Sequence, residues 1–469
     1  MNGIVVAAAA AAERPEPEDR PALVRVGLLA ALACAIPLAG WLFWAIVLRL
    51  GPNDFHDYWL AGRLILDGKS PYDMTAMAAL AREEHLSFSL GGGYSYPLPF
   101  AVAMVPFALL PFDAAVVCFN LVSVAAFGLT VATWLAVAHR GATVRNLAAA
   151  AAMAGAYPPI YGTVAMGQAN LVLFPLMALG LSATVTVRGR PDHRNRDLLG
   201  GALLGLAAIV KLVPAALLAP LALARKWGAC VGLITSAVAA MAVSAAIVPW
   251  ALSGSGGLAA LFDPDGYYTN QSINGFVSRL VTQTSRSSPL LPQAFDPRLA
   301  MLAATALFGV VTLAVLWRAR RATAGRTGLA YGAALALTAA TIGAPKTSFW
   351  NESLLLVAVA LVLAVESPDL RTRATSQAGR AGPLDRIDLA LVAVWFGSAV
   401  AWALVWAFEP SRGGPLWAVV SLAWSASLYG MLALWLMLAR RLLRLESRVG
   451  DRPAKEPAEA QAEASSTIS

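Results

Sequence analysis

Apolar runs alternate with short polar segments along almost the whole chain. The first run covers residues 25–49, a polar segment follows at 50–96, and apolar runs then recur up to residue 440. A run of about 20 apolar residues is long enough to cross a bilayer as a helix. The pattern therefore predicts an all-α, polytopic membrane protein. Further apolar segments are expected at 113–138, 144–162, 169–187, 198–210, 212–224, 228–249, 298–317, 328–343, 350–365, 388–407 and 415–440.

Basic residues gather in short loops between the apolar runs, for example at 139–145 and 318–326. Such loops of membrane proteins lie mostly in the cytoplasm. With this sidedness, two long loops, 50–96 and 250–297, share the outer face. The count is then about twelve transmembrane helices, provided that 97–111 dips into the membrane without crossing it.

The predicted organisation has three parts: a cytoplasmic N-terminal segment at 1–24, a polytopic membrane domain at 25–440 and a disordered cytoplasmic tail at 441–469. The tail is polar, as disordered segments are. The first residues lack a basic stretch before their short apolar start, so we expect the first span to be an uncleaved anchor.

Composition supports a membrane protein without a large soluble domain. The chain has 469 residues, of which 58% are hydrophobic and 13% charged, whereas soluble domains carry roughly 25% charged residues. The net charge of +8 fits basic cytoplasmic loops better than a nucleic-acid surface. The three cysteines lie in apolar runs and the four histidines show no metal-ligand spacing, so no metal or cofactor is expected.

The stretch NDFHDYWLAGRLILDGKSPYD, residues 53–73, places ionisable side chains directly after the first apolar run. Residues 57–67 have helical spacing and predict a helix along the membrane surface, with Gly68 and Pro71 as its stop. Asp67 and Asp73 are interpreted as turn residues around that stop.

Asp54 has two interpretations that can hold together. Asn53 or Asp54 is a suitable N-cap for the following helix. A carboxylate at a helix start, beside the bilayer, is equally suited to be a general base. His56 and Asp57 are alternative bases, although a solvated loop face is the simpler interpretation of both.

Lys211 lies in the middle of the apolar run 203–220. A lysine within hydrocarbon is costly, so a functional role is the default hypothesis. The run is too long for one ordinary span and Pro214 follows closely, which predicts two shorter helices meeting at Lys211. A lysine there could hold a lipid-linked phosphate, and a lysine that extends its ammonium to the interface is the alternative.

Neutral polar groups mark further candidate positions. Gln168 and Asn170 stand at the outer mouth of a span, where they suit either a polar helix start or the binding of sugar hydroxyls. Tyr96 and Trp350 are interfacial anchors or rings that stack on a sugar.

The second outer loop contains FDPDGYYTNQSINGFVSRL, residues 262–280. Arg279 adds a guanidinium fork that matches phosphate, and the DPD sequence is interpreted as a turn. The amides that offer neutral hydrogen bonds in this loop are Asn270, Gln271 and Asn274.

Five segments, DFHDYWLAGRLILDGKSPYD, YSYPLPFAVAMVPFALLPF, GQANLVLFPLMALGL, KLVPAALLAPLALARKW and NQSINGFVSRL, occur in this order over about residues 50–365. Together they resemble the family-87 glycosyltransferases. The resemblance implies a multi-helix membrane glycosyltransferase fold of the GT-C type. It also implies an active site on the outer face of the bacterial inner membrane, a polyprenyl-phosphate sugar as donor, typically of mannose, a lipid or glycan acceptor, and inverting chemistry without a bound metal.

The resemblance also assigns roles. The acidic residue of the family falls on Asp54, followed by Tyr58, and its lysine after the short span falls on Lys211. The GQ pair of the family corresponds to Gly167 and Gln168. Asp54 is then the expected general base, and Lys211 and Arg279 the expected groups for the donor phosphate.

One departure and one rival interpretation bear on this assignment. Family members often carry a histidine-containing patch where this chain reads SFWNES, at 348–353, which weakens the expectation of mannose. Broken helices with a charge at the break also suit a lipid-linked sugar flippase or transporter. Against that alternative, no internal repeat is visible and the polar groups gather in the loops of one face.

Overall fold

The computed structural model describes residues 53–86, 94–138, 157–185, 193–252, 263–283, 289–291, 296–366, 384–407 and 422–450. Within these ranges all regular structure is helical, apart from one isolated bridge between Asn270 and Ser348. The helices are α3 (Asn53–Leu66), α4 (Met74–Glu83), α5 (Leu98–Ala108), α6 (Phe112–Val137), α8 (Pro158–Ala165), α9 (Asn170–Val185), α10 (His193–Val210), η1 (Val213–Leu217), α11 (Leu218–Leu223), α12 (Trp227–Ile247), η2 (Pro249–Leu252), α13 (Ile273–Val281), α14 (Pro297–Arg318), α15 (Arg320–Thr323), α16 (Arg326–Gly343), η4 (Phe349–Ser353), α17 (Leu354–Glu366), α18 (Arg386–Ala407) and α20 (Ala426–Gly450).

Six helical segments in the described part of the chain are long and apolar enough to cross a membrane. They are α6, α12, α14, the continuous segment Phe349–Glu366, α18 and α20, and shorter apolar helices accompany them. The expectation of an all-α polytopic membrane protein is therefore confirmed. The count of about twelve spans stays a prediction, because the first expected span at 25–49 lies outside the described residues.

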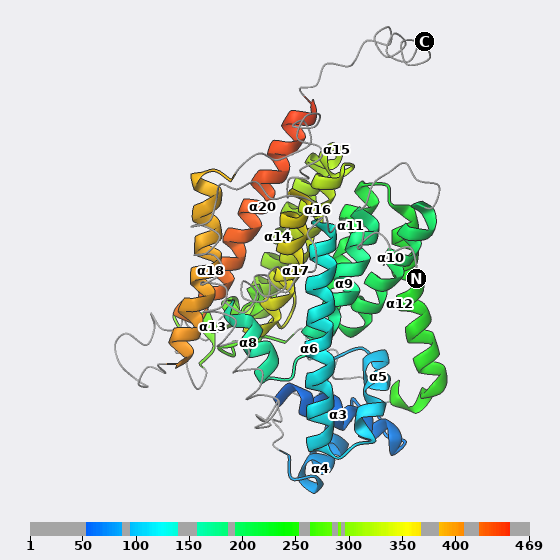
Figure 1. Cartoon of the computed structure of the whole chain (residues 1–469). Coiled ribbons are helices and arrows are strands. Elements are labelled where there is room, and N and C mark those ends of the chain that lie inside the picture. Colours follow the sequence, from blue (N-terminus) through cyan, green and yellow to red (C-terminus); the bar gives the residue numbers. More distant parts are fainter. Residues whose placement is uncertain are drawn as a thin grey trace, which may run out of the picture.

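The two ends of the bundle differ in character (Figure 1). Helices α3, α4 and α5 gather at the lower end in this view, below most of α6, while α15 and the C-terminal end of α20 lie at the upper end. The upper end holds the arginine-rich segments 318–326 and 440–448. The lower end holds the predicted surface helix, so these two arginine-rich segments lie at the opposite end of the bundle from α3.

Local signals set the boundaries of the first helices. The predicted surface helix is α3, which begins at Asn53, four residues earlier than the apolar spacing alone suggests. It ends before Gly68, which adopts a left-handed φ of 69° that favours glycine. The Asp73 carboxylate caps α4 by accepting from the backbone N–H groups of Thr75 and Ala76, as a turn aspartate should.

The segment expected to dip into the membrane contains α5, a helix of 11 residues with Pro106 inside it. Its length of about 16 Å is roughly half of what a bilayer crossing needs. It packs against α3 and α12, and the expectation that 97–111 does not cross the membrane stays a prediction.

The helix break at Lys211 is present as predicted. Helix α10 ends at Val210, and after Lys211 and Leu212 the chain continues in the short helices η1 and α11. Helix α10 packs tightly against its neighbours through glycines: an added methyl at Gly201 would collide with the Ala229 carbonyl, and one at Gly232 with the Leu198 carbonyl. Gly201 and Gly205 are four residues apart, the spacing that brings membrane helices into backbone contact.

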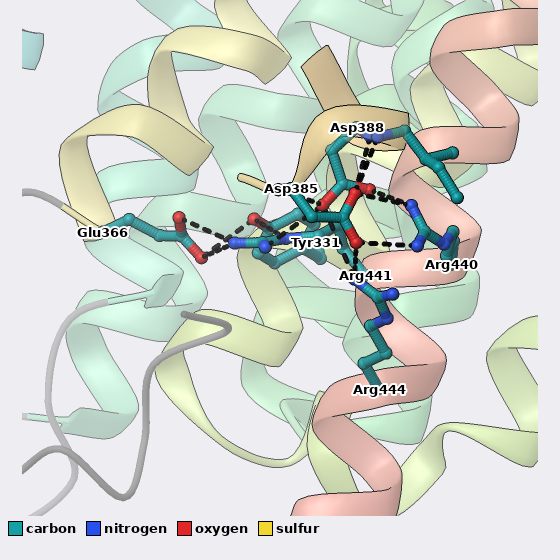
Figure 2. Close-up of polar contacts among 8 residues, drawn as sticks. Tyr331, Glu366, Asp385, Asp388, Arg440, Arg441 and Arg444 are labelled. Carbon is teal, nitrogen blue, oxygen red and sulfur yellow. Dashed lines mark hydrogen bonds and ion pairs between the residues drawn. The ribbon is translucent and has the colours of Figure 1, made fainter. Parts of the chain in front are cut away.

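An ion-pair cluster ties α18 and α20 to α16 and α17 (Figure 2). Asp388 and Arg441 are almost completely buried at its centre. Arg440 donates to Asp388 at 2.8 Å and to Asp385 at 2.7 Å, while Arg441 reaches Asp388 at 3.3 Å. The tail expected from residue 441 is thus corrected at its start: α20 continues to Gly450, because its basic residues find acidic partners instead of solvent.

Candidate active site

Asp54 is held at the first turn of α3 by the chain that precedes α9. The backbone N–H groups of Asp54 and Phe55 donate to the Met166 carbonyl at 3.1 and 3.3 Å. The next residue, Gly167, has a left-handed φ of 62°, which turns the chain into Gln168 and α9. Because α3 already begins at Asn53, Asp54 lies inside the helix start, where the helix dipole stabilises a carboxylate.

Tyr58, Tyr96 and Gln168 form one hydrogen-bonded group beside Asp54. The hydroxyls of the two tyrosines are 2.7 Å apart, and Oε1 of Gln168 lies 3.2 Å from the Tyr58 hydroxyl and 3.3 Å from that of Tyr96. Tyr58 and Gln168 are buried and Tyr96 is half-buried. Residues predicted from three separate segments therefore meet at one place.

Lys211 points its ammonium into the same region. It donates to Oδ1 of Asn170 at 2.8 Å and to Oδ1 of Asn351 at 2.5 Å, and its Nζ lies 6.0 Å from the centre of the Tyr96 ring. An ammonium has three N–H donors, and two of them are used by these amides. The amides hold the cation without neutralising it.

Burial and mutual attraction shape the titration of the two charged groups. Burial raises the pKa of Asp54 to about 7, against an opposing effect of the Lys211 charge. Burial lowers the pKa of Lys211 to about 7, and the Asp54 charge opposes that shift. Asp57 also has a pKa raised to about 7, by burial and by the nearby Asp54 charge. A carboxylate with a pKa near neutrality is suited to accept and release a proton.

Trp350 adds an indole N–H near the carboxylate of Asp54. This group lowers the pKa of Asp54, and it makes no direct hydrogen bond to any of the described residues. A buried N–H without a partner is unusual in a folded protein. It is thus available to Asp54 or to a bound hydroxyl.

Asn170 connects the lysine to the turn that carries Trp350. Its Nδ2 donates to the Trp350 carbonyl at 3.0 Å and to the Ser353 hydroxyl at 3.1 Å, while its Oδ1 accepts from Lys211. The Thr163 hydroxyl donates to the same Trp350 carbonyl at 2.9 Å. The side chains of α8 and α9 therefore fix η4 against the helix break.

The three amide residues predicted in the second outer loop lie in a separate network. Asn270 accepts from the Thr347 N–H at 3.1 Å, Gln271 donates to the Trp424 carbonyl at 2.7 Å, and Asn274 donates to the Pro345 carbonyl at 2.9 Å. The network binds the loop to the segment before η4 and to the start of α20. Sugar binding by these amides stays a prediction.

Arg279 is buried within that second network. Its guanidinium donates to the carbonyls of Tyr267 and Asn270 at 2.9 and 2.7 Å and to the Ser425 hydroxyl at 2.8 Å. Burial lowers its pKa to about 10, so it stays charged at neutral pH. In the described residues its contacts are with the loop and α20, and its role in phosphate binding stays a prediction.

Two other positions differ from the simplest interpretation of the sequence. His56 is not on a solvated face: it is 6% exposed and its ring packs on Phe112 at 4.7 Å, because α3 turns this side toward α6. Asn351, which the polar run 343–353 places on the outer face without assigning it a role, contacts Lys211 directly. Its place in that polar run between two apolar segments was the signal for it.

The fold and the site together define a multi-pass membrane protein with a carboxylate and a lysine at one end of its helix bundle. The family model of glycosyltransferase family 87 matches residues 94–345, more than half of the chain, so this protein belongs to glycosyltransferase family 87. The resemblance inferred from the five segments is confirmed.

The chain is also similar to a protein of Mycolicibacterium smegmatis, the polyprenol-phosphate-mannose-dependent alpha-(1-2)-phosphatidylinositol pentamannoside mannosyltransferase. The two are 27% identical over 311 residues, which cover 62% of this chain and 68% of the relative. No solved structure matches the chain.

Proposed function

We propose that this membrane glycosyltransferase transfers a hexosyl residue, mannosyl in the first instance, from a polyprenyl-phosphate sugar to a lipid or glycan acceptor. The observation that carries the proposal is that Asp54 and Lys211 lie in one buried polar cluster, close enough for the charge of each to shift the pKa of the other. A base and a cation within one site are the two groups that transfer from a phosphate-linked sugar requires. The donor of the mycobacterial relative, as its name states it, supports the choice of sugar carrier.

In the proposed reaction the acceptor hydroxyl oxygen attacks the anomeric carbon and its proton passes to the Asp54 carboxylate. The bond between the anomeric carbon and the phosphate oxygen breaks, and the electron pair leaves with the polyprenyl phosphate. Attack from the face opposite the leaving group inverts the configuration at that carbon. Lys211 offsets the charge on the departing phosphate.

The surrounding polar groups have supporting roles in this proposal. Gln168 and Tyr96 belong to the hydrogen-bonded group beside Asp54, and Tyr96 also lies near the Lys211 ammonium, so we assign them to binding hydroxyls of the sugar or the acceptor. Asn170 and Asn351 keep the lysine oriented. The site faces the outside of the bacterial inner membrane if the arginine-rich end of the bundle is cytoplasmic.

The test is transfer by purified protein from labelled polyprenyl-phosphate mannose to a lipid extract. Asp54→Asn should abolish product formation while the protein still binds the donor, because the amide keeps the shape of the carboxylate but cannot accept the proton. Asp73→Asn is the matched control: Asp73 is an exposed cap of α4, and asparagine caps as well as aspartate. Full transfer by Asp54→Asn would refute the assignment of the base.

A further inference from the structure

Glu352 is a completely buried carboxyl group that the proposed reaction does not use. The Tyr157 hydroxyl donates to its Oε2 at 3.3 Å, and its Oε1 has no hydrogen-bond partner among the described residues. The Ser427 hydroxyl of α20 interacts with this carboxyl group and has no other hydrogen-bond partner among the described residues. No basic side chain of the described residues pairs with Glu352. Since an unpaired buried carboxylate is costly, the neutral acid fits this site.

The neighbours of Glu352 in η4 face the active site. Asn351 accepts from Lys211, and the carbonyl of Trp350 accepts from Asn170. The short helix η4 thus has one side on the catalytic cluster and one side on Tyr157 and α20. Tyr157 in turn packs on Trp395 and Phe396 of α18, with ring centres 5.0 and 5.9 Å apart.

We propose that Glu352 is a positioning residue, which anchors η4 to Tyr157 and α20 so that Asn351 stays within hydrogen-bonding distance of the Lys211 ammonium. The inference rests on the proposed function for its catalytic consequence. This role for Glu352 also gives α18 and α20 a part in shaping the site, although both helices follow the residues matched by the family model. Through Tyr157 and Glu352 they would hold η4 in place, and with it the Asn351 oxygen that accepts from Lys211.

The physical consequence falls on the charge of Lys211. A hydrogen bond to the charged form of a group favours that form. If η4 shifts, the lysine loses the Asn351 oxygen and gives up its proton at lower pH. Loss of one hydrogen bond to a charged group is expected to lower kcat/KM about tenfold.

The experiment is a double-mutant cycle between Glu352 and Asn351, read through the pH dependence of kcat/KM. Glu352→Leu should move the alkaline limb to lower pH, as Asn351→Ala does. In the Asn351→Ala background, Glu352→Leu should produce no further shift, because the contact through which it acts is already absent. Glu352→Gln, which keeps the shape and the hydrogen-bonding atoms, should restore most of the activity.

A second readout is independent of transfer. The labelling of Lys211 by a small amine-reactive reagent, followed by mass spectrometry across a pH series, reports the fraction of neutral amine. Glu352→Leu should make Lys211 react at lower pH, whereas Glu446→Leu should not, because Glu446 is a buried carboxylate that pairs with Arg321 at the other end of the bundle. If Glu352→Leu does not fold, Glu352→Asp withdraws the carboxyl by one methylene and should shift the labelling in the same direction.

Two results would overturn the inference: losses that add in the double variant, or an unchanged Lys211 labelling profile in every folded Glu352 variant. A failure of the proposed function has a different signature, since the unsubstituted protein would then transfer no sugar from any polyprenyl-phosphate donor. The labelling profile still decides the inference in that case.

Discussion

Asn170 and Lys211 are joined by a hydrogen bond of 2.8 Å between Oδ1 and Nζ, across 41 positions of sequence. The same amide group donates from its other end to the carbonyl of Trp350. One side chain at the start of α9 therefore fixes both the cation and the indole that faces Asp54.

The rate of transfer should depend on pH as a bell-shaped curve. Asp54 must be ionised to accept a proton, and since burial raises its pKa to about 7, kcat/KM falls as pH falls below about 7. Lys211 must be charged, and since burial lowers its pKa to about 7, kcat/KM falls as pH rises above it. Lys211→Arg tests the second limb: the activity that remains should lack the alkaline limb, because arginine stays protonated. An alkaline limb that persists in this variant would assign it to another group.

Trp350→Phe should move the acid limb of the same curve to higher pH. The substitution keeps an aromatic ring next to Gly162 but removes the N–H that lowers the pKa of Asp54. Without it the carboxyl holds its proton to higher pH. The measurement is kcat/KM between pH 5 and 9, with Trp317→Phe, on the surface of α14, as the matched control. A loss of activity with no shift of the limb would contradict this role.

Arg279→Met should lower stability on the order of 2–3 kcal/mol, because a charged donor of several hydrogen bonds is removed and two carbonyls lose their partner. The KM for the donor should stay unchanged in the folded protein. Thermal unfolding in detergent and donor titration measure the two quantities. The opposite result, a raised donor KM with stability intact, would support the phosphate-binding role predicted from the sequence.

Arg441→Met should cost about 3 kcal/mol of stability, because it removes one partner of the buried Asp388. The value lies at the low end for a buried pair since Arg440 still bonds to Asp388. Arg298→Met is the control: its ion pair with Asp263 is exposed on both sides, and such pairs contribute about 1 kcal/mol or less. Equal losses in the two variants would contradict a structural role for the cluster in Figure 2.

Much of the site could be predicted from polar side chains that interrupt an apolar sequence. Asp54, Gln168, Asn170 and Lys211 each stand at a helix end or break, where a charge or amide in a membrane protein needs a reason. The helix break at Lys211 was predictable because the run was too long for one span and contained a proline. The approximate position of α3 followed from apolar spacing and the glycine after it.

Distances between loops could not be predicted in the same way. Arg279 and Lys211 both suited a phosphate by residue type, but the guanidinium is used by carbonyls of its own loop. Asn351 and Glu352 are adjacent in sequence, and only the packing of η4 between α8 and α20 sends their side chains to different neighbours. The sequence predicted that the last apolar helix ends at residue 440, whereas α20 ends at Gly450. The acidic partners of its arginines lie 52 to 59 positions away in the sequence, so their contribution could not be predicted.

The glycine contacts of α10 bear on how a lipid carrier can arrive. Where Gly201 and Gly232 meet the backbone of the neighbouring helix, no space is left for even a methyl group. For the polyprenyl-phosphate carrier proposed above, this seam between α10 and α12 offers no passage. A lateral entrance for that carrier is then expected on another side of the bundle, from which its phosphate would reach Lys211 at the end of α10.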